Sequence, residues 1–320
     1  MLDNKEIIKT KPLIIIAGPT ATGKTEVSIK LAKAINGQII SADSMQAYKY
    51  MDIGSAKITP AEMEGIRHYG VDIIDPTKDY NVFEFQKMAK EAIDNIYLEG
   101  SMPIIVGGTG FYIQSVLYDI DFTDTDSDDS IRKELSDIAA KNGADYLHHM
   151  LEEIDKESAL TIHANNVKRV IRAIEYYRKT GEKFSLHNDT QKLKKSPYKY
   201  LFFCLTDNRD TMYERIDLRV DKMLDMGLID EVKKLKSMGL TRDTVSMQGL
   251  GYKEILDYIN GSLSLDEAIY TVKRDTRHFA KRQLTWFRRE NDVIWLNRSE
   301  LGDTNNIFNT MLDKFNEYYK

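Results

Sequence analysis

Residues 13–25 read LIIIAGPTATGKT, an apolar run that leads directly into a glycine-rich loop. The run Leu13–Ala17 is typical of a short buried strand. The loop Gly18–Thr25 matches G-x-x-x-x-G-K-[ST] at every specified position. Apolar residues spaced by three and four then predict a helix over Lys24–Ile35. Strand, loop and helix follow one another in the order that a phosphate-binding loop requires, so we expect a phosphate or diphosphate to bind here.

Each part of this loop has a chemical purpose. Gly18 and Gly23 let the backbone turn so that successive N–H groups point at one anion. The helix N-terminus favours negative charge, and Lys24 adds a cation. The Thr25 hydroxyl can hold Mg²⁺, the cofactor that we predict. The predicted ligands of the anion are Gly18, Pro19, Thr20, Ala21, Thr22, Gly23, Lys24 and Thr25.

The rest of the chain predicts an α/β fold, a P-loop NTPase-like parallel sheet flanked by helices, with an inserted all-helical domain. Short apolar runs that alternate with helical patterns indicate this arrangement. Further strands are expected over Gln38–Ala42, Pro103–Val106, Tyr200–Leu205 and Asp292–Leu296. Helices are expected over Val82–Leu98, Arg209–Met226 and Leu265–Arg288.

The pattern of alternating strands and helices is interrupted once. From residue 123 to about residue 197 the sequence has helical periodicity and no convincing strand. We therefore expect a first part of the α/β core over 1–122, a helical insertion over 123–199, and a second part of the core with basic helices over 200–320. The polar stretch His187–Pro197 ends in proline and is predicted to be a mobile connector.

Composition limits the class of protein. The chain has 320 residues, 42% of them hydrophobic, and a net charge of −5. It has no apolar stretch near the length of a membrane span, so no membrane contact is expected. The single cysteine, Cys204, excludes an internal disulfide and every cysteine-based zinc site. We expect a cytoplasmic protein, and no obligate protein partner is evident.

Charge is unevenly distributed along this acidic chain. Eight carboxylates lie in residues 119–137, and a solvated face is the simplest interpretation of that run. Seven cations lie in residues 273–289 against Asp275 alone, with aromatic residues between them. Such a segment can follow a phosphate backbone and stack on bases, although a plain solvated face remains open.

A carboxylate follows the predicted second strand, in Ser41–Gln46 (SADSMQ). Because Asp43 comes at the carboxyl end of a strand, it is expected at the ligand crevice of an α/β sheet. A helix-capping role is the alternative. The strand Pro103–Val106 ends instead in GGTG, without the acidic metal ligand that is usual in ATP-hydrolysing machines.

Seven motifs occur in order along the chain. They are GPTATGKT (18–25), DSMQ (43–46), MDIGSAK (51–57), GGTGFYIQ (107–114), RVIRAIE (169–175), GLGYKE (249–254) and DTRHFAKRQLTWFR (275–288). From about residue 11 to residue 297, their order and spacing resemble those of the tRNA dimethylallyltransferase family. Phe111, where leucine is usual, and Ser55, where threonine is frequent, are mild departures.

The resemblance implies transfer of a dimethylallyl group from dimethylallyl diphosphate to N6 of the tRNA adenosine next to the anticodon on its 3′ side, position 37. Diphosphate leaves, and the phosphate loop holds the prenyl donor rather than a nucleotide. The catalytic residues implied are Asp43, Thr25, Lys24 and Arg219. Asp43 would accept the proton of the amine, and the cations would stabilise the leaving group. Without the resemblance, Arg219 would be interpreted as an exposed arginine paired with Asp217 or Asp221.

The resemblance also implies a surface for the tRNA anticodon stem-loop. Gln46 would read the extruded adenine by paired hydrogen bonds, and the basic helices would hold the backbone. The residues implied are Asp43, Ser44, Met45, Gln46, Thr109, Arg132, Lys168, Arg169, Arg172, Arg277, Lys281 and Arg282.

Three other functions remain open from the sequence. A small-molecule P-loop kinase shares the loop and the sheet, but it does not need the basic run at 274–289. A prenyltransferase that acts on free AMP or ADP does not need a helical insertion of about 75 residues. An RNA-binding protein without catalysis leaves the intact phosphate loop unexplained.

Overall fold

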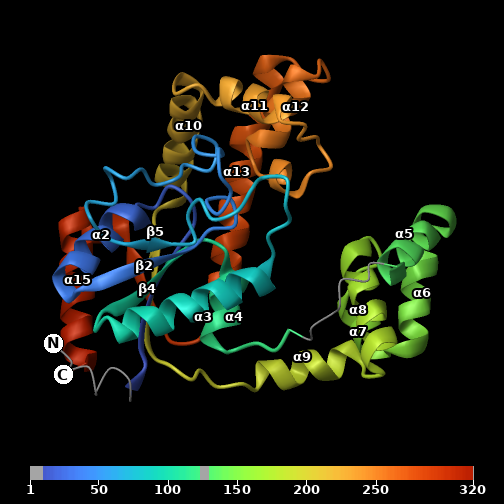
Figure 1. Cartoon of the computed structure of the whole chain (residues 1–320), viewed down its shortest axis with the longest axis horizontal. Coiled ribbons are helices and arrows are strands. Elements are labelled where there is room, and N and C mark those ends of the chain that lie inside the picture. The colour runs from blue at the N-terminus through green and yellow to red at the C-terminus, as the bar shows by residue number, and fades with distance from the viewer. Residues whose placement is uncertain (1–9, 123–129, 320) are drawn as a thin grey trace. The chain divides into compact units, whose positions relative to one another are not determined.

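The computed structural model describes residues 10–122 and 130–319 and forms two compact units (Figure 1). The first unit combines the chain up to Leu117 with the chain from Pro197 onward, and the second comprises Tyr118–Ser196. Among the described residues, no helix has the length and the apolar character needed to cross a membrane.

A six-stranded parallel sheet forms the centre of the first unit, which confirms the predicted fold class. Its order is β3-β2-β4-β1-β5-β6. Ala17 at the end of β1 lies opposite Gly107 of β4, and Gly107 lies opposite Ala42 of β2. These three strands therefore end together, and the loops that follow them share one edge of the sheet. The strands are β1 (Pro12–Ala17), β2 (Gly37–Ala42), β3 (His68–Tyr69), β4 (Met102–Gly107), β5 (Lys199–Thr206) and β6 (Val293–Asn297).

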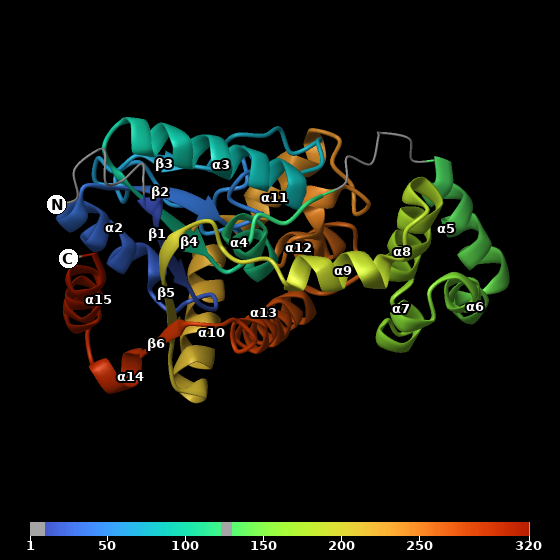
Figure 2. The same cartoon turned by 90° about the horizontal axis from the view of Figure 1, so that it is seen from below.

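Helices cover both faces of this sheet because its strands are apolar on both sides. On one face, Ile14 and Ile16 belong to the same core cluster as residues of α2 (Lys24–Ile35) and α15 (Thr304–Tyr319). On the other face, Phe287 of α13 packs edge-on against Phe202 of β5. Figure 2 shows the helices on both sides of the strands. Other helices of the unit are α3 (Val82–Leu98), α4 (Gly110–Leu117), α10 (Arg209–Asp225), α11 (Leu228–Ser237), the 3₁₀ turn η1 (Val245–Gln248), α12 (Tyr252–Ile259), α13 (Leu265–Phe287) and α14 (Arg298–Leu301).

The described residues of the second unit form helices joined by short loops, without a strand. Leu135, Leu147, Leu151, Val170 and Ile174 are completely or almost completely buried in its separate core. Its core is separate from the cluster against the sheet, as expected for a unit that packs its own apolar side chains. The helices are α5 (Ser130–Asn142), α6 (Ala144–Ile154), α7 (Lys156–Thr161), α8 (Val167–Thr180) and α9 (Phe184–Lys192).

The structure differs from the sequence prediction at the proposed connector His187–Pro197. Residues up to Lys192 belong to α9. The first turn of this helix is anchored because Asp155 accepts hydrogen bonds from the Ser185 N–H and hydroxyl, at 2.8 and 2.7 Å. His187 also packs on the Tyr176 ring, with 4.8 Å between centroids. Tertiary contacts thus stabilise a helix that local sequence did not indicate.

Two predictions fall partly on residues 123–129, which lie outside the described residues. These are the boundary of the insertion at residue 123 and the solvated acidic run over 119–137. The strand β3 was not predicted, because two residues at a sheet edge give no readable alternation.

Candidate active site

The phosphate loop connects the end of β1 to the start of α2. Gly18 adopts a φ of +143°, and a Cβ there would lie 2.4 Å from the carbonyl oxygen of Leu205. Only glycine fits this position. The Lys24 ammonium folds back over the loop and donates hydrogen bonds to the carbonyls of Gly18 and Pro19, at 2.9 and 2.8 Å. The loop therefore places its cation at the mouth of the predicted anion site.

Lys24 is buried beside a second cation, Arg219. Burial and the neighbouring charge of Arg219 lower the pKa of Lys24 to about 8. Burial also lowers the pKa of Arg219, and the carboxylate of Asp43 acts in the opposite direction. The alternative partners expected for Arg219 are engaged elsewhere, because Asp217 pairs with Arg277 and Asp221 with Lys273. Arg219 instead lines the pocket beside the loop.

A pocket of about 670 Å³ lies at the common edge of the strands. Thr25 of the loop, Asp43 after β2 and Thr109 after β4 all line it. An Asp43 oxygen accepts a hydrogen bond from the Met45 N–H at 2.9 Å, which fixes the orientation of the carboxylate. The predicted catalytic residues Lys24, Thr25, Asp43 and Arg219 are thus brought to one cavity.

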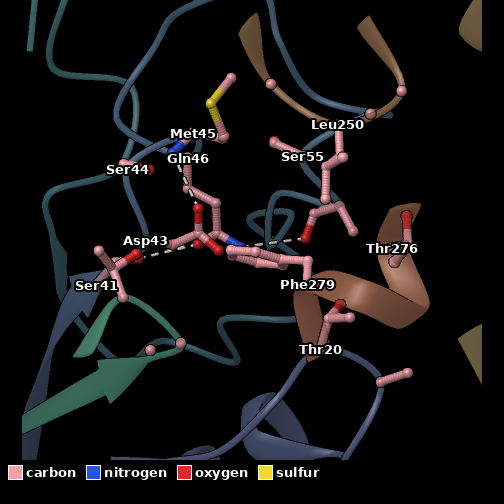
Figure 3. A pocket seen from close by; sticks show the side chains of 18 of the residues that line it. Thr20, Ser41, Asp43, Ser44, Met45, Gln46, Ser55, Leu250, Thr276 and Phe279 are labelled. Carbon is pink, nitrogen blue, oxygen red and sulfur yellow. Dashed lines mark hydrogen bonds between the residues drawn. The ribbon is translucent and has the colours of Figure 1, made fainter. Parts of the chain in front are cut away.

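The Gln46 amide is held in one orientation (Figure 3). Its Oε1 accepts a hydrogen bond from the Ser41 hydroxyl at 3.0 Å, and its Nε2 donates to the carbonyl of Ala56 at 3.2 Å. An amide oxygen has two lone pairs and an amide nitrogen two hydrogens. Each of these two bonds uses only one of them, so the amide retains one donor and one acceptor for a ligand.

Helix α13 contributes pocket residues that we did not predict as part of the reaction site. Thr276, Phe279 and Gln283 line the cavity together with Arg282. Phe279 extends into the pocket (Figure 3), and the Arg282 guanidinium lies 5.8 Å from its ring centroid. The spacing of three and four residues places these side chains on one helix face. That spacing was available in the sequence, where the segment was interpreted as one that follows a phosphate backbone and stacks on bases, not as part of the reaction site.

The GGTG turn after β4 is shaped by α13. A Cβ on Gly108 would lie 2.2 Å from the Gln283 amide nitrogen, and one on Gly110 would lie 2.2 Å from Cδ1 of Trp286. The two glycines therefore allow close approach of the helix. Between them, the Thr109 N–H donates to the Ala42 carbonyl at 3.2 Å.

A second cluster fixes the wall of the pocket that carries the MDIGSAK motif. The Glu231 carboxylate on α11 accepts three hydrogen bonds from the successive backbone N–H groups of residues 52–54, at 2.8 to 3.1 Å. The buried Tyr252 hydroxyl donates to Glu231 at 2.8 Å and accepts from the Ser55 N–H at 3.1 Å. The sequence analysis missed Glu231, because no local pattern links it to a loop about 180 residues earlier.

Of the predicted basic tRNA contacts, only Arg282 lines the pocket, and three of the others form ion pairs. Arg132 and Arg172 both bind the buried Glu175 carboxylate, at 3.0 and 3.3 Å, within the helical unit. Arg277 donates two hydrogen bonds to Asp217, at 2.6 and 2.7 Å. These three side chains therefore form ion pairs within the chain, and their role in tRNA binding stays a prediction.

The remaining predicted cations are solvent-facing. Lys168 and Arg169 are exposed on α8 of the helical unit, and Lys281 is exposed on α13. Arg282 is exposed and also lines the pocket. A role of these four residues in tRNA binding stays a prediction.

The residues at the phosphate loop suit Mg²⁺. Thr25 supplies a hydroxyl oxygen to the pocket, next to the place where the loop would hold phosphate oxygens. Mg²⁺ usually takes few protein ligands and binds phosphate oxygens and water in its remaining positions. No group of three acidic, histidine or cysteine side chains able to hold a metal occurs among residues 10–122 and 130–319. Such a group is not required for a magnesium ion carried with a diphosphate.

A phosphate loop, a carboxylate and an amide with free hydrogen-bonding capacity open into one pocket. This combination defines an enzyme of the P-loop class that transfers a group from a phosphorylated donor. The sequence profile of the IPP transferase family matches residues 46–290. The chain is also 59% identical over 302 residues to the tRNA dimethylallyltransferase of Lachnoclostridium phytofermentans, covering 94% of this chain and 96% of that protein. The chain therefore belongs to the IPP transferase family.

Solved structures agree with this assignment. The tRNA isopentenylpyrophosphate transferase of Bacillus halodurans is 43% identical, with a TM-score of 0.71 over 96% of this chain and 98% of that one. The enzyme of Staphylococcus epidermidis is 44% identical, with a TM-score of 0.71 over 96% and 99%. A eukaryotic dimethylallyltransferase acting on tRNA is 32% identical, with a TM-score of 0.78 over 89% and 73%.

Proposed function

We propose that this enzyme transfers the dimethylallyl group of dimethylallyl diphosphate to N6 of adenosine 37 in tRNA, giving N6-dimethylallyladenosine and diphosphate. One observation carries the proposal. The phosphate loop and Asp43 open into the same pocket, so a diphosphate on the loop has its attached carbon within a cavity that also holds a carboxylate. Membership of the family supports tRNA as the acceptor.

In this reaction the N6 nitrogen forms a bond to C1 of the prenyl group. The bond between C1 and the diphosphate oxygen breaks, and its electron pair leaves with the diphosphate. The exocyclic amine of adenine is a weak nucleophile because its lone pair is delocalised into the ring. Asp43 accepts the N6 proton as the new bond forms, which is general-base catalysis.

Cations at fixed positions stabilise the negative charge that develops on the diphosphate. Lys24 and Arg219 both line the pocket, and the N-terminus of α2 follows the phosphate loop directly. Preorganised donors of this kind stabilise developing charge strongly in a partly desolvated site. Thr25 would hold Mg²⁺, which supplies further charge neutralisation to the diphosphate when bound.

The adenine would enter from the side of Gln46 and Phe279. Gln46 offers one donor and one acceptor, which matches the N6 and N7 pattern of adenine. Phe279 offers a ring on which an unstacked base can stack. The solvent-facing cations Lys168, Arg169, Lys281 and Arg282 would contact the backbone of the anticodon stem-loop.

The test is to incubate the enzyme with dimethylallyl diphosphate labelled in its prenyl group. Three acceptors are compared, namely a tRNA with adenosine at position 37, the same tRNA with guanosine there, and AMP. We expect label only in the first, with one diphosphate released for each group transferred. Label in AMP would support a free-nucleotide prenyltransferase, and ATP hydrolysis stimulated by a small acceptor would support a kinase.

A further inference from the structure

The phosphate loop contains a residue in an unfavourable backbone conformation. Ala21 has a φ of +65°, in the left-handed region that residues with a Cβ rarely adopt. Such a conformation persists only where the surroundings hold it in place. Ala21 lines the pocket, so contacts that fix it also fix the surface that a diphosphate would meet.

The residue before Ala21 is held by a buried side chain of α13. The N–H of Thr20 donates to Oε1 of Gln283 at 3.2 Å. Nε2 of the same amide donates to the carbonyl of Gly108 at 2.9 Å. Gln283 is 7% exposed; its hydrogen bond to Gly108 is buried and its hydrogen bond from Thr20 is partly buried. Gln283 therefore links the phosphate loop to the GGTG turn.

The Ala21 side chain is held from the other side. It packs against a small cluster formed by α10 and α13, whose buried members are Met212, Ile216 and Ala280. Ala280 and Gln283 are three residues apart on one helix face. Helix α13 thus fixes the turn through an apolar contact to Ala21 and a hydrogen bond from Thr20 to Gln283.

We infer that Gln283 is a positioning residue that keeps the strained turn of the phosphate loop ready to bind diphosphate. The inference rests on the proposed function, in which the loop holds the prenyl diphosphate. Gln283 acts through the Thr20 N–H and the Gly108 carbonyl rather than by touching the reacting atoms. Without it the turn can relax, and binding then requires the loop to be reordered.

Binding of inorganic pyrophosphate with magnesium, measured by calorimetry in the absence of tRNA, tests the inference. Gln283→Met keeps the length and burial of the side chain but removes both hydrogen bonds. We expect pyrophosphate to bind roughly tenfold more weakly, as one to two lost hydrogen bonds predict. The KM for tRNA at saturating prenyl diphosphate should stay within about twofold of the wild-type value, because Gln283 acts on the phosphate loop. A twofold change corresponds to under about half a kcal/mol. Thr285→Ala, an exposed position on the same helix, is the matched control.

A second substitution separates positioning from a general loss of structure. Ala21→Gly removes the conformational penalty at the strained residue, because glycine tolerates positive φ. The loss caused by Gln283→Met should therefore be smaller when residue 21 is glycine than when it is alanine. Unchanged pyrophosphate binding in Gln283→Met, or an equal loss in both backgrounds, would overturn the inference. Intact pyrophosphate binding by a wild-type enzyme that transfers no prenyl group would count against the proposed function alone.

Discussion

Lys24 and Arg219 line one pocket as two cations that repel each other. Burial lowers the pKa of Lys24 to about 8, and the charge of Arg219 contributes in the same direction. The electrostatic repulsion between two neighbouring cations destabilises the protein when the site is empty. The same two cations attract a bound diphosphate. The pair is therefore arranged for a ligand with several negative charges rather than for stability.

This pKa predicts a pH dependence of prenyl diphosphate binding. Above pH 8 the free enzyme loses the Lys24 proton, and the bound diphosphate must restore it. Affinity for dimethylallyl diphosphate should fall as the pH rises above this value, by up to about tenfold per unit. Calorimetry in buffers of different ionisation enthalpy should show proton uptake on binding.

The Lys24→Ala variant is the control for this dependence. It should bind more weakly at every pH and lose the fall in affinity above pH 8. A pH profile that is the same in the variant and in the wild type would assign the dependence to another group. Folding stability changes in the opposite sense. The unfolded chain, with a lysine pKa of 10.5, binds more protons between 8 and 10.5, so this group adds stability as the pH rises through that window.

We predict that the basic surface of α13 has a structural part and a tRNA-binding part. Lys281 is exposed, and its replacement by alanine should lower the slope of log affinity for tRNA against log salt by about one unit. Arg277 is partly buried in its pair with Asp217. Arg277→Ala should lower the melting temperature because it leaves that carboxylate partly buried without its partner.

Filter binding of tRNA at several salt concentrations, together with thermal melts, distinguishes the two residues. Prenyl diphosphate binding should be unchanged in Lys281→Ala. Early melting of Lys281→Ala, or a reduced salt slope with unchanged stability in Arg277→Ala, would reverse the assignment.

The close contact between Gly110 and Trp286 predicts that adding one methyl group at residue 110 destabilises the protein. A Cβ on residue 110 would lie 2.2 Å from the indole, so Gly110→Ala must displace α13 or the GGTG turn. We expect destabilisation of about 1–3 kcal/mol, the usual cost of overpacking. Chemical denaturation would measure it. The double variant Gly110→Ala, Trp286→Ala should lose less than the sum of the two single variants, and simple additivity would contradict the contact.

The sequence predicted those features that depend on local pattern. The bounds of α2 and α3 follow directly from apolar spacing, and the loop motif led to the pocket with Asp43 and Lys24. Long-range pairing was not predictable in this way. Nothing in the sequence around Glu231 indicates that its carboxylate binds three N–H groups of residues 52–54.

The basic residues show the same limit. Arg132 and Arg172 belong to a helical sequence pattern that is typical of a charged surface. In the structure, both form ion pairs with the buried Glu175. A cation on a helix face looks the same in sequence whether it contacts solvent, a phosphate or a buried carboxylate. Only the tertiary structure identifies its partner.

The proton acceptor at Asp43 is the central claim, and single-turnover transfer to tRNA by Asp43→Ala tests it most directly. With enzyme in excess over tRNA and with prenyl diphosphate saturating, the rate of prenyl transfer should fall by about 10² to 10⁴. This is the usual cost of losing a general base. The Kd for tRNA should remain close to that of the wild type, and Asp94→Ala, which removes an exposed carboxylate on α3, serves as the control. A single-turnover rate in Asp43→Ala equal to that of the wild type would contradict the account.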